Sequence, residues 1–84
     1  MKVQIVTPNG EIFAGTASSV RLPVIDGSYG VLEHHEPTLL VLTAGDVICR
    51  AEDGERRIPV SGGVCEIERD SVLVLTEPNG SPSI

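Results

Sequence analysis

Residues 26–45 read DGSYGVLEHHEPTLLVLTAG, and the rest of the chain is organised around this stretch. The two glycines of residues 27–30 predict a tight turn, because glycine tolerates positive φ. A polar segment with two adjacent histidines follows at residues 33–36, and Pro37 closes it. The apolar run Leu39–Leu42 then predicts a strand buried on both faces between two layers, ending at the last glycine. A loop held between two apolar strands is typical of a surface that meets another molecule.

The flanking sequence indicates an all-β protein. Nine glycines and six prolines in 84 residues predict many turns, and apolar residues alternate with polar ones between them. We therefore predict an antiparallel β-sandwich of about 8–10 short strands in two sheets. Residues 1–77 form one domain in this interpretation, and residues 78–84 form a flexible C-terminal tail. The expected strands are 2–7, 11–14, 17–24, 31–32, 38–43, 46–51, 56–61, 64–68 and 71–76.

Composition and charge argue against several classes of function. The formal net charge of −6 disfavours nucleic acid or an anionic bilayer surface as a direct ligand. No apolar run approaches the roughly 18–20 residues that a bilayer-spanning helix needs, and no segment resembles a signal peptide. These features predict a soluble intracellular protein without direct bilayer insertion. The acidic balance is compatible with a basic protein partner and equally with solubility alone.

The side chains that could take part in catalysis or metal binding do not form a recognisable catalytic motif. Cys49 and Cys65 each fall inside an expected strand, which favours two buried free thiols over a disulfide. His34 and His35 point to opposite sides of an extended chain, so a single metal site would rarely use both. No phosphate-binding glycine loop opens a helix, and no serine sits at a strand-to-helix elbow. We therefore expect no enzyme activity, no cofactor and no metal.

Three segments in register carry a resemblance to a known family. Residues 5–11, IVTPNGE, are followed by Phe13 and Gly15. Residues 27–32, GSYGVL, precede the His35-x-Pro37 pair. Residues 60–63, VSGG, precede a final pair of strands. In this order and spacing, over nearly the whole chain, the sequence resembles the N-terminal β-sandwich domain of the epsilon subunit of F-type ATP synthases. It ends where the C-terminal helical hairpin of that family would begin.

The resemblance implies a non-catalytic central-stalk subunit in a hetero-oligomer. Such a subunit binds the gamma subunit and the c-ring, and it couples proton or sodium flux to ATP synthesis or hydrolysis. The resemblance also implies a peripheral location on the cytoplasmic side of the bacterial inner (plasma) membrane, within the F1 sector. The residues that it places toward the c-ring are Asp26, Gly27, Ser28, Tyr29, Gly30, Val31 and Leu32. Those that it places toward gamma are Thr7, His35 and Leu40.

Some alternatives stay open at this point. Tyr29 is either an anchor for a partner at a loop tip or a core residue at the end of the sandwich. Relatives usually carry Pro-Gly where this chain has Glu33-His34, which leaves the backbone path of that loop open. A stand-alone β-sandwich adaptor for another protein is the second functional hypothesis. A small metal-binding protein that uses His34 or His35 is the third.

Overall fold

The computed structural model describes residues 1–77, and these residues form an all-β fold as predicted. The predicted tail, residues 78–84, lies outside the described residues. Residues 1–77 contain no helix, and so none long and apolar enough to cross a membrane. The strands are β1 (Lys2–Thr7), β2 (Gly10–Thr16), β3 (Ser19–Val24), β4 (Gly27–Leu32), β5 (Thr38–Ala51), β6 (Gly54–Ile67) and β7 (Ser71–Leu75).

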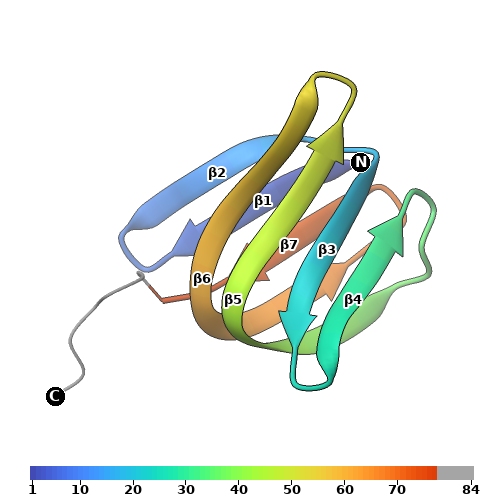
Figure 1. The fold of residues 1–84 in the computed structure, drawn as a ribbon. Coiled ribbons are helices and arrows are strands. Elements are labelled where there is room, and N and C mark those ends of the chain that lie inside the picture. Colours follow the sequence, from blue (N-terminus) through green and yellow to red (C-terminus); the bar gives the residue numbers. More distant parts are fainter. Residues whose placement is uncertain (78–84) are drawn as a thin grey trace, which may run out of the picture.

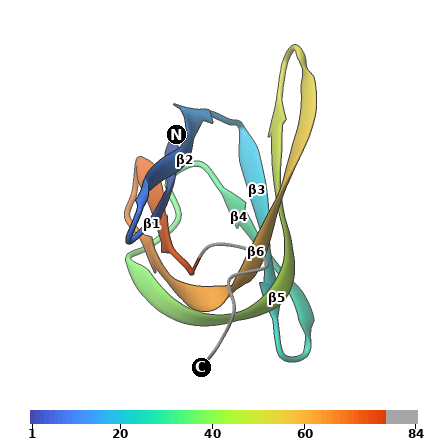
Figure 2. The ribbon, with the colours of Figure 1, turned by 90° about the vertical axis from the view of Figure 1, so that its left-hand side faces the viewer.

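All seven strands belong to one hydrogen-bonded sheet in the order β2-β1-β7-β6-β5-β3-β4. The prediction of two antiparallel sheets is corrected in two respects, since the sheet is continuous and β1 runs parallel to β7. Figures 1 and 2 show how this sheet folds over on itself. The first layer holds β1, β2 and β7, and the second holds β3 and β4. The long strands β5 and β6 run through both layers and join them.

The two long strands replace four of the predicted short ones, which lowers the strand count to seven. Gly45 and the pair Gly62-Gly63 were expected to end strands, but they lie inside β5 and β6. The ladder between β5 and β6 keeps a single register and lacks only the Thr43–Gly62 pair. Gly62 and Gly63 have φ of +112° and +123°, which side-chain-bearing residues rarely adopt. The glycines therefore bend the paired strands without ending them.

The bend changes which residues of β5 face the core. Before it, Leu40 and Leu42 point inward, whereas Val47 and Cys49 point inward after it. Side chains alternate with a period of two along a regular strand, so this switch requires an irregular position between them. Strand β6 switches in the same region, from Val60 to Cys65. Because both strands switch together, the inner side of the folded sheet stays apolar throughout.

Three hairpins share one turn pattern. Each has a two-residue loop, and the returning strand opens on a glycine with φ between +127° and +135°. Two of them, at Asn9-Gly10 and Asp53-Gly54, were predicted from the sequence. The third is at Asp26-Gly27, where the tight turn had been expected across residues 27–30. That expectation is wrong, because residues 27–32 form β4 along its whole length.

The core fills the space between the two layers. Its buried residues are mainly β-branched. Phe13 and Tyr29 pack against its margin and are themselves half-buried. The core residues are Val3, Ile5, Ala17, Val20, Leu22, Val31, Leu42, Val47, Cys49, Val60, Cys65, Ile67, Val72 and Val74.

His34 resolves the open question about the loop after β4. It has a φ of +66°, the left-handed conformation that glycine adopts most readily. Its backbone N–H donates to the carbonyl oxygen of Arg69 over 3.0 Å, which holds the chain in this path. The loop thus keeps a glycine-like backbone with a histidine in place.

Replacing His34 by glycine is expected to stabilise the fold by about 0.5–1 kcal/mol, because it removes the cost of the left-handed conformation. The exposed His34 Nδ1 lies 3.9 Å from Asp70 Oδ1, a contact that contributes little. Urea unfolding measures the change, and His34→Ala is the control because it removes the ring but keeps Cβ. Equal stability of the glycine and alanine variants would contradict the argument.

Candidate protein-interaction surfaces

An exposed apolar row crosses the outer side of the first layer. Val41 pairs with Val64, Val64 with Leu75, and Leu75 with Val6, so that four strands contribute neighbouring side chains. Leu39 extends the row along β5. The exposed fractions are 70% for Leu39, 76% for Val41, 45% for Leu75 and 38% for Val64. A monomeric soluble protein rarely exposes contiguous large apolar residues, so this apolar row is a candidate docking surface.

The apolar row corrects the expectation that residues 39–42 are buried on both faces. Leu42 is in the core and Leu40 packs against it, but Leu39 and Val41 point away from it. Apolar residues on both sides of a strand have two explanations, burial between layers or one exposed docking face. The sequence pattern is the same for both, and only the position of the strand in the fold decides between them.

Carboxylates border the apolar row. Glu66 pairs with Leu39 on β5 and with Leu73 on β7. Glu11 pairs with Val6 and accepts a hydrogen bond of 2.9 Å from the Gln4 side chain. Glu77 lines the shallow hollow beside Leu75. The rim is therefore largely acidic, which suits a partner with basic side chains around an apolar surface.

A second exposed apolar residue lies at the tip of the β3–β4 hairpin. Ile25 is 87% exposed and forms the two-residue loop together with Asp26. Ile25 was not among the residues expected to face a partner. The signal that would have found it is an isoleucine directly before Asp-Gly, where a hairpin tip normally carries a polar residue.

The residues expected to face the c-ring are divided by the structure. Asp26 lies at the hairpin tip, and Gly27, Ser28, Gly30 and Leu32 are exposed along β4. Val31 instead belongs to the core, at 1% exposure, and Tyr29 is half-buried. Five of these seven residues are thus accessible on one hairpin.

Tyr29 and His35 form a linked pair at the margin of the core. The Tyr29 hydroxyl lies 3.0 Å from His35 Nε2, and His35 Nδ1 lies 2.7 Å from the carbonyl oxygen of Glu36. Because a carbonyl can only accept, Nδ1 carries the proton in the neutral ring and Nε2 accepts from Tyr29. Tyr29 is therefore not at a loop tip. Its ring packs against the core, and its hydroxyl holds the histidine that closes the loop.

The other residues expected to face gamma have different surroundings. The Thr7 side chain is buried, donates to the Gly10 carbonyl over 3.1 Å and accepts from the Asn9 N–H over 3.1 Å, which braces the first hairpin. Thr7 also lines the shallow hollow beside Leu75. Leu40 is half-buried against the core. The structure brings Thr7 close to the apolar row, and it turns the Leu40 side chain toward the opposite side of β5.

The two cysteines are free and buried, as the sequence favoured. Burial raises the pKa of Cys49, and the Arg56 charge partly opposes that rise. Burial, followed by the charge of Glu66, raises the pKa of Cys65 to about 12. Among residues 1–77, no group of three or more His, Cys, Asp or Glu side chains is placed to hold a metal ion.

The raised pKa of Cys65 predicts a loss of stability at alkaline pH. An unfolded chain releases the thiol proton near pH 9, whereas the folded chain keeps it up to about pH 12. The Cys65 thiol therefore makes its full contribution to the free energy of unfolding below about pH 9. Above that pH, up to the folded-state pKa, this contribution falls by about 1.4 kcal/mol per pH unit. Urea unfolding at about pH 8 and about pH 10 measures it. Cys65→Ala, although less stable, should lose that part of the pH dependence, and an unchanged slope would contradict the assignment.

Comparison with known proteins places this architecture in a family. The model of the family "ATP synthase, Delta/Epsilon chain, beta-sandwich domain" matches residues 1–78. The ATP synthase epsilon chain of Alkalihalophilus pseudofirmus is 34% identical over 83 residues, covering 99% of this chain and 62% of the relative. That of Moorella thermoacetica is 40% identical over 78 residues, covering 92% of this chain and 58% of the relative. The chain thus spans about three fifths of the length of these curated relatives.

Solved structures share the fold. A chain of the Euglena gracilis mitochondrial ATP synthase (OSCP/F1/c-ring) superposes with a TM-score of 0.79 at 22% identity, over 88% of this chain and 48% of that one. A chain of the Tetrahymena thermophila mitochondrial ATP synthase central stalk/c-ring superposes with a TM-score of 0.71 at 18% identity, over 92% and 63%. With a family match over residues 1–78 and relatives above 30% identity, the chain belongs to the delta/epsilon-chain family of ATP synthases, through the β-sandwich domain of that family.

Proposed function

We propose that this protein is a non-catalytic central-stalk subunit of an F-type ATP synthase. It links the gamma subunit to the c-ring, and it passes torque between ion flux through the ring and ATP synthesis or hydrolysis. The observation that carries the proposal is the exposed apolar row across four strands, in a chain that belongs to this family. A stalk subunit needs a broad, permanent contact, and such contacts are apolar at their centre.

The two exposed apolar features suit two different partners in this proposal. The apolar row, with Thr7 beside it and carboxylates at its rim, receives the gamma subunit. The β3–β4 hairpin, with Ile25 and Asp26 at its tip, meets the c-ring. The subunit then lies peripherally, on the cytoplasmic side of the bacterial plasma membrane, within the F1 sector. His35 acts on the gamma side by fixing the loop through Tyr29.

Native mass spectrometry tests the proposal with the gamma subunit and detergent-solubilised c-ring from the same source. A one-to-one complex with gamma, and joint attachment of that complex to the c-ring, are the expected results. Binding to neither partner, by a chain that circular dichroism shows to be folded, would refute the stalk function and favour the adaptor hypothesis. Leu40→Arg is a poor probe of the gamma contact, because Leu40 packs against the core and its loss would weaken the fold itself.

A further inference from the structure

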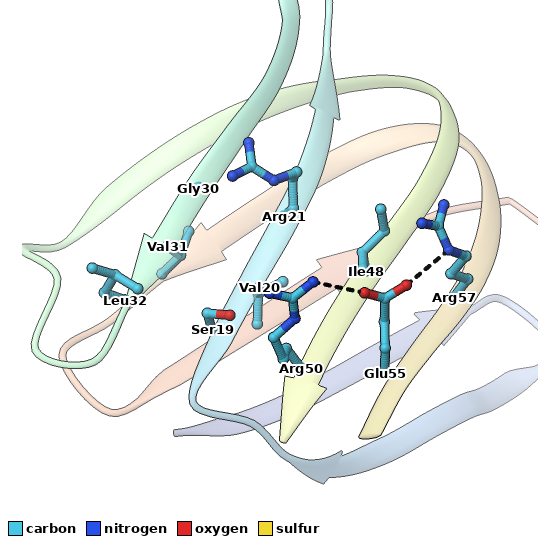
Figure 3. A pocket seen from close by; sticks show the side chains of 10 residues that line it. All are labelled: Ser19, Val20, Arg21, Gly30, Val31, Leu32, Ile48, Arg50, Glu55 and Arg57. Carbon is cyan, nitrogen blue, oxygen red and sulfur yellow. Dashed lines mark hydrogen bonds and ion pairs between the residues drawn. The ribbon is translucent and has the colours of Figure 1, made fainter. Parts of the chain in front are cut away.

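The outer side of the second layer gathers half of the chain's positive charge. Three of the six Lys and Arg side chains, Arg21, Arg50 and Arg57, line one hollow of about 510 Å³ (Figure 3). They come from three neighbouring strands, β3, β5 and β6, and they point away from the core. We refer to these three residues, with Glu55 and Ile48 between them, as the arginine face. In a chain of net charge −6, this is an unusual concentration of cations.

Strand register explains how the arginine face forms. Arg21 pairs with Ile48, and Ile48 pairs with Arg57, so these three side chains lie in one row across the sheet. A second row runs through Arg50 and Glu55. The arginines are far apart in sequence, and only the pairing of β3 with β5 and of β5 with β6 brings them together. The sequence alone does not indicate that these three arginines share one face.

Glycine and serine residues leave the hollow open toward β4. Gly30 pairs with Arg21 and has no side chain, and a Cβ atom there would lie 3.8 Å from the Arg21 Nη2 atom. The Arg21 side chain extends in this direction and donates a hydrogen bond of 2.9 Å to Ser28 Oγ. No carboxylate among residues 1–77 pairs with Arg21, so most of its N–H donors remain available.

Glu55 holds the other two arginines without cancelling their charge. Its carboxylate accepts two hydrogen bonds, one on each oxygen: one of 2.9 Å from Arg50 Nη2 and one of 3.0 Å from Arg57 Nε (Figure 3). These hydrogen bonds keep the pKa of the Glu55 carboxyl below its ordinary value, and the bond from Arg50 has the larger effect. One carboxylate between two guanidinium groups leaves a net positive charge and fixes the direction of both side chains. Asp46, farther along β5, does not line the hollow.

We propose that the arginine face binds an extended acidic segment of a partner protein, in which every second residue is a carboxylate. Neighbouring strands lie about 4.8 Å apart, so Arg21 and Arg57 arise about 10 Å from each other across the sheet. Alternate side chains of an extended segment are about 7 Å apart, which lets successive carboxylates reach different arginines. Ile48, between Arg21 and Arg57, and Leu32, on the β4 side of the hollow, contact the aliphatic parts of those acidic side chains.

The spread of the arginines favours a polypeptide over a small anion. A phosphate site needs several donors aimed at one point, whereas here Arg50 and Arg57 converge on Glu55 and Arg21 is directed toward Ser28. Residues 1–77 also contain no helix, so no helix N-terminus there offers a backbone N–H cradle for an anion. The inference concerns the side of the molecule away from the apolar row and does not rest on the proposed stalk function.

A short blocked peptide of alternating glutamate and leucine tests the proposal with the 84-residue chain by fluorescence anisotropy and amide NMR shifts. We expect binding that weakens as salt is added, and amide shifts centred on the outward residues of β3, β5 and β6. Arg21→Gln and Arg57→Gln should each weaken binding about tenfold, since each removes charge-assisted hydrogen bonds. The same peptide with glutamine in place of glutamate should not bind.

Arg56→Gln is the matched control. Arg56 is the neighbour of Arg57, but its guanidinium lies over the Phe13 ring at 5.6 Å, on the other side of β6. It should bind the peptide as the unchanged protein does. Equal weakening by Arg56→Gln would reduce the effect to general charge attraction and overturn the proposal. Displacement of the peptide by equimolar inorganic phosphate would replace it with a small-anion site, and absence of binding at about millimolar peptide would refute it outright.

Discussion

Replacing Gly63 by alanine is expected to destabilise the fold by about 3–5 kcal/mol, a large part of the stability of a domain this small. Gly63 lies in β6 at the bend, with a φ of +123°. A Cβ atom there would collide with the carbonyl oxygen of Leu75 and crowd the Cα of Thr76, both of them backbone. Backbone cannot move aside as the end of a long side chain can, so β6 and β7 would have to separate.

Gly54 provides the matched control for this substitution. It lies in the same strand with a φ of +135°, and nothing is within 4 Å of the position of its Cβ. Gly54→Ala therefore carries only the conformational cost, about 1–2 kcal/mol. Urea unfolding followed by circular dichroism measures both variants, and the difference between them is the cost of the collision. Equal losses at the two positions would show that the bend has room that the structure does not indicate.

Replacing Val41 by lysine is expected to weaken binding to the gamma subunit by about 100-fold, because a buried valine contributes about 1.5–3 kcal/mol and a buried lysine must lose its hydration. Val41 is 76% exposed in the free chain, so the free energy of unfolding should change by less than about 0.5 kcal/mol. Calorimetric titration with gamma, together with urea unfolding of the variant, separates the two effects.

Ile25→Lys is the control that distinguishes the two proposed partner surfaces. Ile25 is as apolar as Val41 and more exposed, but it lies at the tip of the β3–β4 hairpin. It should leave gamma binding unchanged and weaken attachment to the c-ring. If Ile25→Lys lost gamma binding and Val41→Lys kept it, the assignment of the apolar row to gamma would be wrong, although the family membership would stand.

Local sequence patterns determined most of the extended segments and two of the three hairpins. Val3 and Ile5 alternate with Lys2 and Gln4, and the structure buries the first pair and exposes the second. The Asn9-Gly10 and Asp53-Gly54 pairs each mark a hairpin, because glycine supplies the positive φ that the returning strand needs. These features depend only on neighbouring residues, so they can be predicted without knowledge of the fold.

The resemblance to the family likewise depended on short segments in a fixed order, and the family match over residues 1–78 confirms it. The candidate surfaces were predicted less well. Residues 26–32 were expected to form a loop that faces a partner, with Tyr29 as a possible anchor at its tip, but they form a hairpin strand and the tip lies at Ile25 and Asp26. The arginine face was missed because Arg21, Arg50 and Arg57 are not neighbours in the chain. They share a face only through the pairing of three strands.

The sequence by itself determined that the chain is an all-β member of this family, with hairpins at Asn9-Gly10 and Asp53-Gly54. The tertiary structure alone decided that Gly45 and Gly62-Gly63 bend two long strands without ending them, and that Leu39 and Val41 face outward. The physical reason is the same in both cases. A glycine permits a bend as readily as an end, and an apolar residue suits a core as well as a docking surface. Whether a glycine bends or ends a strand, and whether an apolar residue is buried or exposed, depends on what packs against that strand. Residues distant in the sequence form that packing.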